Sequence, residues 1–97
     1  MSANDQNQAF DFCASLGKTV AEARADYDGC CIDFAGDFVT ARGGRLAYFR
    51  TPLHQKWCYH ASPLIDGFIH DLWTDNPMPL AEFILHIGAE NVEFPAE

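Results

Sequence analysis

Lysine and arginine are absent from residues 57–97, although the same segment carries seven carboxylates. Residues 1–56 hold the other seven carboxylates and all six bases, so the C-terminal segment supplies −7 of the formal net charge of −8. This negative charge argues against electrostatic binding to DNA, RNA or anionic membranes. The asymmetry therefore favours either simple solubility or a basic partner.

Long apolar runs are also absent. No stretch approaches the roughly 18 consecutive apolar residues of a membrane span, and the polar start Met1–Asp5 lacks the basic and apolar regions of a signal peptide. We therefore expect a cytoplasmic protein. Its 97 residues, 48% of them hydrophobic, predict a single domain over residues 1–97 and exclude a disordered acidic tail.

Catalytic motifs are missing as well. The chain has no nucleophile elbow, no glycine-rich phosphate loop and no HExxH pattern. Cys58, His60 and Asp66 can be combined into a Cys/His/Asp set, but any chain rich in these residue types yields such combinations. We expect no enzyme and no cofactor.

The four cysteines and four histidines do not have the spacing of a common zinc site; the nearest group is His54, Cys58 and His60. No metal is therefore expected. Without a secretory signal, the cysteines are expected to be reduced. The adjacent Cys30 and Cys31 resemble small apolar core residues rather than a disulfide framework.

Two short helices are predicted near the N-terminus. The apolar residues from Ala9 to Leu16 have helical spacing, with Asn4 or Asp5 as a cap and Gly17 at the end. Thr19-Val20-Ala21-Glu22 has the form of a capping box and predicts a second helix over 20–25. One continuous helix through Gly17 is the alternative, at a cost of about 1 kcal/mol.

A meander of strands is predicted next. Residues 30–34 alternate in polarity, Gly36-Asp37 suits a turn, and 38–42 form a second strand. Gly43-Gly44 predicts a hairpin leading to a third strand over 46–51, and a fourth is expected over 56–59.

Two helices are predicted to follow. Ser62-Pro63 suits a helix start, and the apolar residues from Leu64 to Trp73 have the spacing of a buried face that ends at Asn76-Pro77. A last helix runs from Pro79 to Gly88, after which Val92 and Phe94 pack back. The prediction is an α+β domain, with a small antiparallel sheet of three or four strands and the N- and C-terminal helices packed on one face.

Two acidic groups are candidates for binding a basic partner. In the C-terminal helices the carboxylates fall outside the apolar stripe, so they are expected to be exposed; a second group surrounds the first predicted strand. Trp73, like Trp57 and Tyr59, is a candidate for an interface, although it also suits the core. The predicted partner-binding residues are Asp26, Asp28, Asp33, Asp37, Asp66, Asp71, Asp75, Glu82 and Trp73.

In length, acidity and expected fold, the whole chain resembles the small acidic inhibitors of phages and mobile elements, in particular anti-CRISPR proteins. The resemblance implies a monomeric DNA mimic that blocks a type I surveillance complex in the cytoplasm of an infected or lysogenic bacterial host. It carries no motif, so no residue role is transferred by it. Immunity proteins of bacterial toxins are similar in the same respects, including an acidic face that blocks a basic nuclease, and they are one alternative. A small structural or scaffold subunit of a phage is the other alternative.

Overall fold

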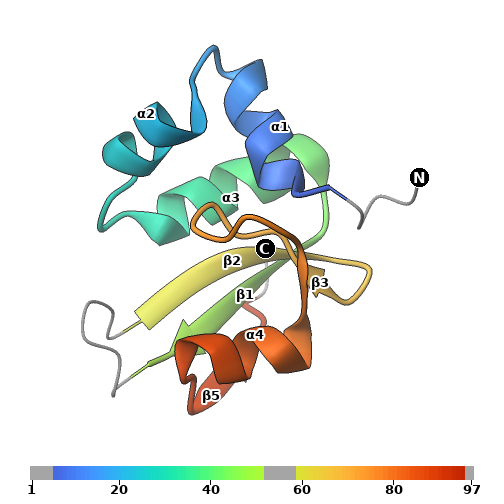
Figure 1. Ribbon diagram of the computed structural model, residues 1–97. Helices are drawn as coiled ribbons and strands as arrows, with labels where there is room; N and C mark the ends of the chain where they lie inside the picture. Colours follow the sequence, from blue (N-terminus) through green and yellow to red (C-terminus); the bar gives the residue numbers. More distant parts are fainter. Residues whose placement is uncertain (1–5, 52–58, 96–97) are drawn as a thin grey trace.

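The computed structural model describes residues 6–51 and 59–95, which form four helices and a five-stranded antiparallel sheet. Figure 1 shows α1–α3 grouped on one side of the sheet and α4 on the other. Along the sheet the strand order is β4-β3-β2-β1-β5. The elements are α1 (Gln8–Ser15), α2 (Val20–Asp26), α3 (Cys31–Arg42), β1 (Arg45–Arg50), β2 (Tyr59–Ile65), β3 (Phe68–Ile69), β4 (Met78–Pro79), α4 (Leu80–Ile87) and β5 (Asn91–Glu93).

The two N-terminal helices agree with the sequence prediction. Helix α1 ends at Ser15 and Gly17 has a φ of 73°, which excludes the continuous helix. Thr19 and Glu22 form the predicted capping box at the start of α2. The cap of α1 is Asn7, whose side chain accepts a hydrogen bond from the Ala9 amide; Asn4 and Asp5, the expected caps, lie outside the described residues.

The prediction of two strands over residues 30–42 is wrong, because this segment is the helix α3. The alternation of Cys30, Ile32 and Phe34 suggested a strand, but the buried residues are Phe34, Ala35 and Phe38, which share one helical face. Ile32, which a strand would place on the same face as Phe34, is 48% exposed. Over so few residues the apolar periodicity of a strand is hard to distinguish from that of a helix, and packing against the sheet decides which one forms.

Gly43-Gly44 is not a hairpin turn but the connection from α3 to β1. Gly44 has a φ of 89°, and a Cβ atom there would lie 2.7 Å from the Leu64 carbonyl oxygen. Glycine is therefore required where the chain passes close to β2. The predicted strand over 46–51 is confirmed as β1; of the strand expected over 56–59, residues 56–58 lie outside the described residues.

The helix predicted from Ser62 to Asn76 is also wrong. Residues 59–69 form a hairpin of β2 and β3, joined by Asp66 and Gly67 with φ angles of 51° and 83°. An Asp-Gly pair is a strong signal for such a turn. Proline has no amide hydrogen to donate to a neighbouring strand, but Pro63 is accommodated in β2 because β3 ends beside it. The Pro63 carbonyl accepts a hydrogen bond from the His70 amide, and the chain then leaves the sheet.

The C-terminal part agrees with the prediction in its helix. Helix α4 is followed by Gly88 in the left-handed conformation, and Val92 lies in β5, paired with β1. Val92 and Phe94 pack against the core beneath α4, as expected.

Two clusters of buried side chains hold these layers together. One joins α1, α2 and α3 around Phe12, Phe34 and Phe38, and the other joins α4 to the sheet around Phe49 and Phe83. The α+β class is confirmed, although the sheet has five strands and the helices form two groups instead of one layer. No helix in the described part of the chain is long and apolar enough to cross a membrane.

Candidate functional site: a cysteine, a histidine and an aspartate

The two halves of the fold meet where α3 begins. Cys31 is the first residue of α3, and its Sγ accepts a hydrogen bond from the Ala61 amide of β2 at 3.4 Å. The edge of β2 explains this contact. The Pro63 carbonyl accepts a hydrogen bond from the His70 amide, just after the end of β3. At Ala61, two residues before Pro63 in β2, β3 no longer runs alongside, and the start of α3 lies there instead. The fold therefore fixes a cysteine side chain at a sheet edge, where it is half-buried.

His60, next to Ala61 on β2, is fully buried. Its Nε2 atom lies 2.7 Å from Asp71 Oδ1. The imidazole also interacts electrostatically with the Cys31 side chain. Its other ring nitrogen, Nδ1, makes no hydrogen bond to the thiol within the usual limits of distance and angle.

Asp71 is held by three donors. Besides His60, the Ser62 hydroxyl donates to Oδ1 at 2.8 Å and the Trp73 amide donates to Oδ2 at 3.0 Å. The carboxylate is 2% exposed, so its position is fixed by the fold and not by solvent. A buried carboxylate with this set of partners orients the imidazole that it contacts.

Aromatic side chains enclose the imidazole. The Trp73 ring meets the His60 ring edge to face at 6.0 Å, and the Phe83 ring of α4 lies at the same distance. Both rings keep water from the hydrogen bond between His60 and Asp71, which strengthens it.

These contacts change the acid–base properties of the pair. Burial alone would lower the pKa of His60, but the hydrogen bond to Asp71 and the interaction with Cys31 raise this pKa from 6.5 to about 9. Burial opposes ionisation of Cys31, yet the interaction with His60 and the hydrogen bond from the Ala61 amide bring its pKa below the ordinary 9.0. Protonation of His60 and ionisation of Cys31 therefore favour each other.

The first turn of α3 provides further donors. The amide of Cys30 donates to the Tyr27 carbonyl at 2.8 Å and that of Asp33 donates to the Cys30 carbonyl at 3.0 Å. Within residues 6–51 and 59–95, the amides of Cys31 and Ile32 have no acceptor, and Cys30 supplies no side-chain cap. These amides and the helix dipole favour a negatively charged oxygen beside Cys31.

One predicted binding residue is corrected by this site. Asp71 was expected to be exposed on a helix, but it is buried in the chain after β3 because that helix does not form. Trp73 was a candidate for either an interface or the core; it is half-buried and lies against His60.

The acidic group predicted around the first strand lies around α2 and α3. Asp26 ends α2 and forms an ion pair with Lys18 at 2.6 Å, and Asp37 accepts a hydrogen bond from the Tyr27 hydroxyl at 3.1 Å. Asp28 and Asp33 are exposed near the start of α3. Two of these four carboxylates are thus already engaged within the chain.

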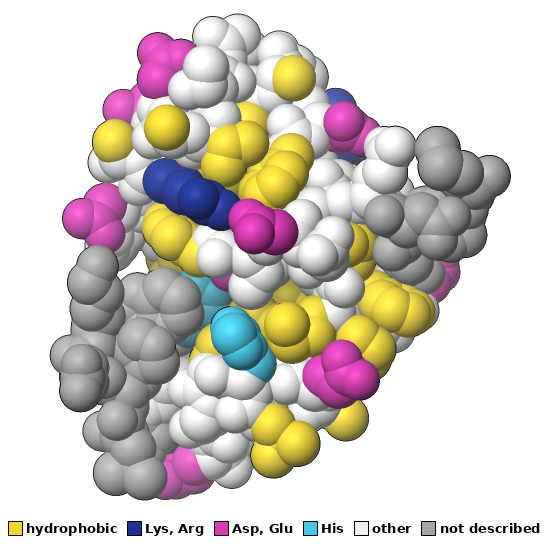
Figure 2. Space-filling view, in the orientation of Figure 1, with side chains coloured by type: hydrophobic (Ala, Val, Ile, Leu, Met, Phe, Trp, Pro, Cys, Tyr) yellow, Lys and Arg dark blue, Asp and Glu magenta, His cyan; other side chains and the backbone are white. Residues whose placement is uncertain are grey.

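The C-terminal acidic group does not share one element. Asp66 is exposed in the β2–β3 turn, Asp75 pairs with Arg24 at 3.9 Å, and Glu82 is exposed in the first turn of α4. On the face shown in Figure 2, most acidic side chains lie toward the periphery and one lies near the middle beside a basic side chain, with hydrophobic side chains between them.

The role of Cys31 was not foreseen from the sequence. Cys58, the cysteine first considered beside His60, lies outside the described residues, and Asp66 is exposed in a turn. The available signal was the helical spacing of Cys31, Phe34, Ala35 and Phe38 after an Asp-Gly pair, which predicts a helix that begins at a cysteine.

The remaining polar groups give no metal site. Within the residues that the structure describes, no three His, Cys, Asp or Glu side chains are placed to hold a metal ion. Comparison with protein-family models, with curated proteins and with solved structures found no match. The function therefore has to be argued from the site itself.

Proposed function

We propose that the protein catalyses acyl transfer through a covalent thioester on Cys31, with His60 as general acid and base and Asp71 as the residue that orients His60. The observation that carries the proposal is that the buried His60 contacts the Asp71 carboxylate at 2.7 Å through Nε2 and also interacts electrostatically with the Cys31 side chain. A nucleophile beside a base that is itself oriented by a third group is the arrangement used in covalent catalysis on unrelated folds. This proposal departs from the sequence-based expectation of a protein without enzymatic activity.

In the first half of the reaction, the Cys31 thiolate adds to a carbonyl carbon of an amide or ester. The carbonyl π electrons move to oxygen, and the resulting negative charge is stabilised by the free amides at the start of α3. When the tetrahedral species collapses, the bond to the leaving group breaks and His60 gives its proton to the departing nitrogen or oxygen. The acyl group remains on Cys31 as a thioester.

In the second half, water attacks the thioester. His60, now neutral, accepts a proton from that water, and the bond between the acyl carbon and Cys31 Sγ breaks. The products are a carboxylic acid and the free thiolate beside a protonated His60. An amine that takes the place of water gives a transferred acyl group by the same steps.

The titration of the pair limits the active pH range. The acylating state needs an ionised Cys31, whose pKa is lowered, and a protonated His60, whose pKa is about 9. Raising the pH through about 9 removes the His60 proton that the leaving group requires, so acylation of poor leaving groups should decline there.

Acylation of Cys31 can be measured directly with p-nitrophenyl acetate. We expect a burst of p-nitrophenol of about one equivalent per chain, followed by slower turnover as the thioester hydrolyses. The acetyl group should be found on Cys31 by peptide mass spectrometry.

The neighbouring cysteine is a matched control. Cys30 is exposed, adjacent in sequence and without a described histidine partner. Cys30→Ser should keep the burst, whereas Cys31→Ser and His60→Gln should reduce its rate by about a thousandfold or more. A burst that persists in Cys31→Ser, or that disappears in Cys30→Ser, contradicts the proposal.

A second candidate is the acidic inhibitor of a basic nucleic-acid-binding protein, such as an anti-CRISPR protein or an immunity protein. The observation that favours it is that Asp28, Asp33 and Glu82 are exposed and have no hydrogen bond or ion pair through their carboxylates within the described chain. Pull-down from cell extract at low and high salt tests it: a salt-sensitive partner that is retained by Cys31→Ser and lost when Asp28, Asp33 and Asp37 are changed to Asn would support inhibition without catalysis.

A further inference from the structure

A hollow of about 330 Å³ lies between α3 and β1. It is lined by Gly36, Val39 and Thr40 of α3 and by Leu46 of β1. Gly36 leaves room in this wall, since a Cβ atom there would have no neighbour within 4 Å. Val39 and Leu46 are only half-buried, so solvent reaches an apolar surface here.

The apolar surface continues along the helix and the strand. Ile32 is 48% exposed and lies four residues before Gly36, on the same side of α3. In β1, Ala47 packs toward α4, so its neighbours Leu46 and Tyr48 point to the side of the sheet that carries α3. The resulting α3–β1 groove consists of Ile32, Gly36, Val39, Thr40, Leu46 and Tyr48.

The sheet face beside this groove is open. Helix α3 lies mainly over β2. Glu93 of β5 is paired with Tyr48, so the two side chains share a face, and both Glu93 and Asn91 are exposed there. Two strand spacings of about 4.8 Å separate β2 from β5, which is close to the distance of about 8–10 Å between packed helices. One further helix beside α3 therefore fits over β1 and β5.

Carboxylates border the groove on both sides. Asp33 is exposed on α3, and Glu93 is exposed on β5. Arg50 lies on the same face of β1, but its Nε is 3.8 Å from Glu90 Oε1, so its charge is compensated. A second copy of the chain would bring like charges together, whereas a basic partner would meet opposite ones.

We infer that the α3–β1 groove binds an amphipathic helix of a protein partner, with apolar residues along one face and lysine or arginine on its flanks. The apolar face lies on Leu46 and Tyr48, and one of its side chains enters the hollow at Gly36. The basic flanks lie toward Asp33 and Glu93. The inference does not depend on acyl transfer; it gives the basic partner of the second candidate function a location and a form.

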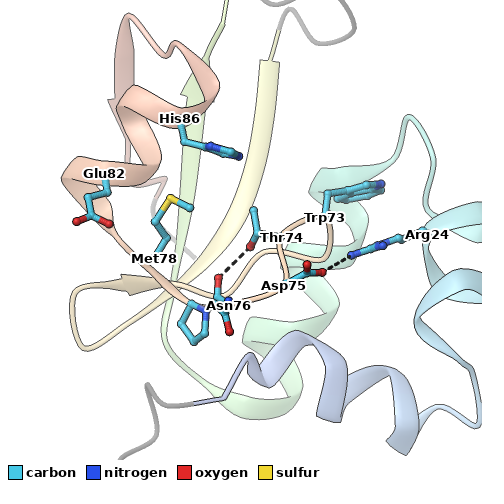
Figure 3. Close-up of a pocket in the computed structure, with 9 residues that line it drawn as sticks. Arg24, Trp73, Thr74, Asp75, Asn76, Met78, Glu82 and His86 are labelled. Carbon is cyan, nitrogen blue, oxygen red and sulfur yellow. Dashed lines mark hydrogen bonds and ion pairs between the residues drawn. The ribbon is translucent and has the colours of Figure 1, made fainter.

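A larger hollow of about 520 Å³ lies at the opposite edge of the sheet, beside β4, and supplies a control. Figure 3 shows Met78 and Glu82 on one side of it and the ion pair of Arg24 and Asp75 on the other. Since this hollow contains a base of its own, we expect a basic helix to prefer the α3–β1 groove. Glu82 is thus an exposed carboxylate whose removal should not matter.

A synthetic peptide of leucine and lysine, with leucine along one helical face, is a direct probe. When it is added to the isotopically labelled protein, we expect the NMR amide signals of α3 and β1 to shift. The same peptide with glutamate in place of lysine should bind about tenfold more weakly or less.

Four variants locate the binding. Gly36→Leu fills the hollow and should weaken binding of the lysine peptide about tenfold or more. Asp33→Asn and Glu93→Gln should each weaken it about two- to fivefold, the size expected of one exposed ion pair. Glu82→Gln, the same kind of charge change at the other edge of the sheet, should leave the dissociation constant unchanged.

Several outcomes would overturn the inference: shifts confined to other elements, equal binding of the two peptides, or a folded Gly36→Leu protein that binds as its parent does. A dimer that Gly36→Leu dissociates, detected by sedimentation, would assign the groove to a second copy instead. The acetate burst tests acyl transfer separately. A burst without peptide binding overturns only this inference, and peptide binding without a burst overturns only the acyl-transfer proposal.

Discussion

Asp71 is the residue whose surroundings most clearly separate a site from an ordinary core. A carboxylate that is 2% exposed needs compensating partners, since an unpaired buried charge costs several kcal/mol. Here His60, Ser62 and the Trp73 amide supply them. All of these groups keep the imidazole in one orientation toward Cys31, so a side chain that is expensive to bury contributes to the geometry of a reactive thiol.

The ionisation of Cys31 is the property that a single substitution should change most. In the native protein, His60 and the Ala61 amide keep the pKa of Cys31 below 9.0, so the thiolate persists as the pH falls below that value. His60→Gln removes the cation, and we expect the midpoint of Cys31 alkylation by iodoacetamide to move toward 9. At a pH below both midpoints, each unit of that shift lowers the rate about tenfold.

A pH profile of alkylation, followed at Cys31 by mass spectrometry, measures this shift. The exposed Cys30 serves as an internal reference, and its profile should not move between the two proteins. Superimposable Cys31 profiles with and without His60 would show that the histidine does not activate the thiol.

At the scale of elements, α3 determines where the reactive thiol stands. It begins at Cys31, after the turn at Asp28-Gly29, and its buried face sets the rotation of the helix and hence the direction of the cysteine. The free amides and the positive end of the dipole belong to the helix and not to any one side chain. An extended segment at residues 30–42 would have neither.

The interior glycine of α3 offers a test of the helix itself. Gly36 has no positive φ, and a Cβ atom there would have no neighbour within 4 Å. We expect Gly36→Ala to raise the free energy of unfolding by about 0.5–1 kcal/mol, because alanine loses less backbone entropy in a helix.

Urea denaturation gives this difference. Gly44→Ala is the contrasting variant and should destabilise the protein, because its Cβ would meet the Leu64 carbonyl oxygen and its φ is 89°. A Gly36→Ala protein that is less stable than its parent would argue against a helix over residues 31–42.

At the scale of the whole molecule, the N-terminal segment is fastened to the chain that carries Asp71. The Asn7 amide donates to the Asp71 carbonyl at 2.7 Å and to the Thr74 carbonyl at 2.8 Å, while its oxygen caps α1. The backbone amide of Gln8 donates to His70 Nδ1 at 3.0 Å. Burial lowers the pKa of His70. Segments more than 60 residues apart therefore stabilise each other and the site together.

Asn7→Ala should show how far the site depends on this connection. The substitution removes two hydrogen bonds to buried carbonyl groups and the helix cap, so we expect a loss of about 2–3 kcal/mol in stability. The acetate burst should also slow under conditions where the protein stays folded.

Urea denaturation and the burst rate are the two measurements, with Asn91→Ala as the control. Asn91 is exposed in β5, and its replacement should change stability by no more than about 0.5 kcal/mol. A burst unaffected by Asn7→Ala would mean that Asp71 keeps its position without the N-terminal segment.

Local signals in the sequence were sufficient for part of this structure. The capping box at Thr19, the glycine at 88 and the apolar spacing of α4 act within a few residues, so they predicted α2 and α4 correctly. The Asp66-Gly67 pair was an equally local signal for a hairpin, but the apolar spacing from Leu64 to Trp73 concealed it. The α+β class followed from the elements that were correct.

The site depended on tertiary structure. Cys31, His60 and Asp71 lie on a helix start, a strand and the chain after a hairpin, and no spacing in the sequence joins them. They meet because β3 is short, which leaves the edge of β2 at Ala61 open for α3. The absence of lysine and arginine from residues 57–97 is visible in the sequence itself. Only packing determines that Asp71 is buried, that Asp75 pairs with Arg24 and that Glu82 is exposed. Carboxylates of the same chemistry therefore have different roles, because their burial and hydrogen bonds differ.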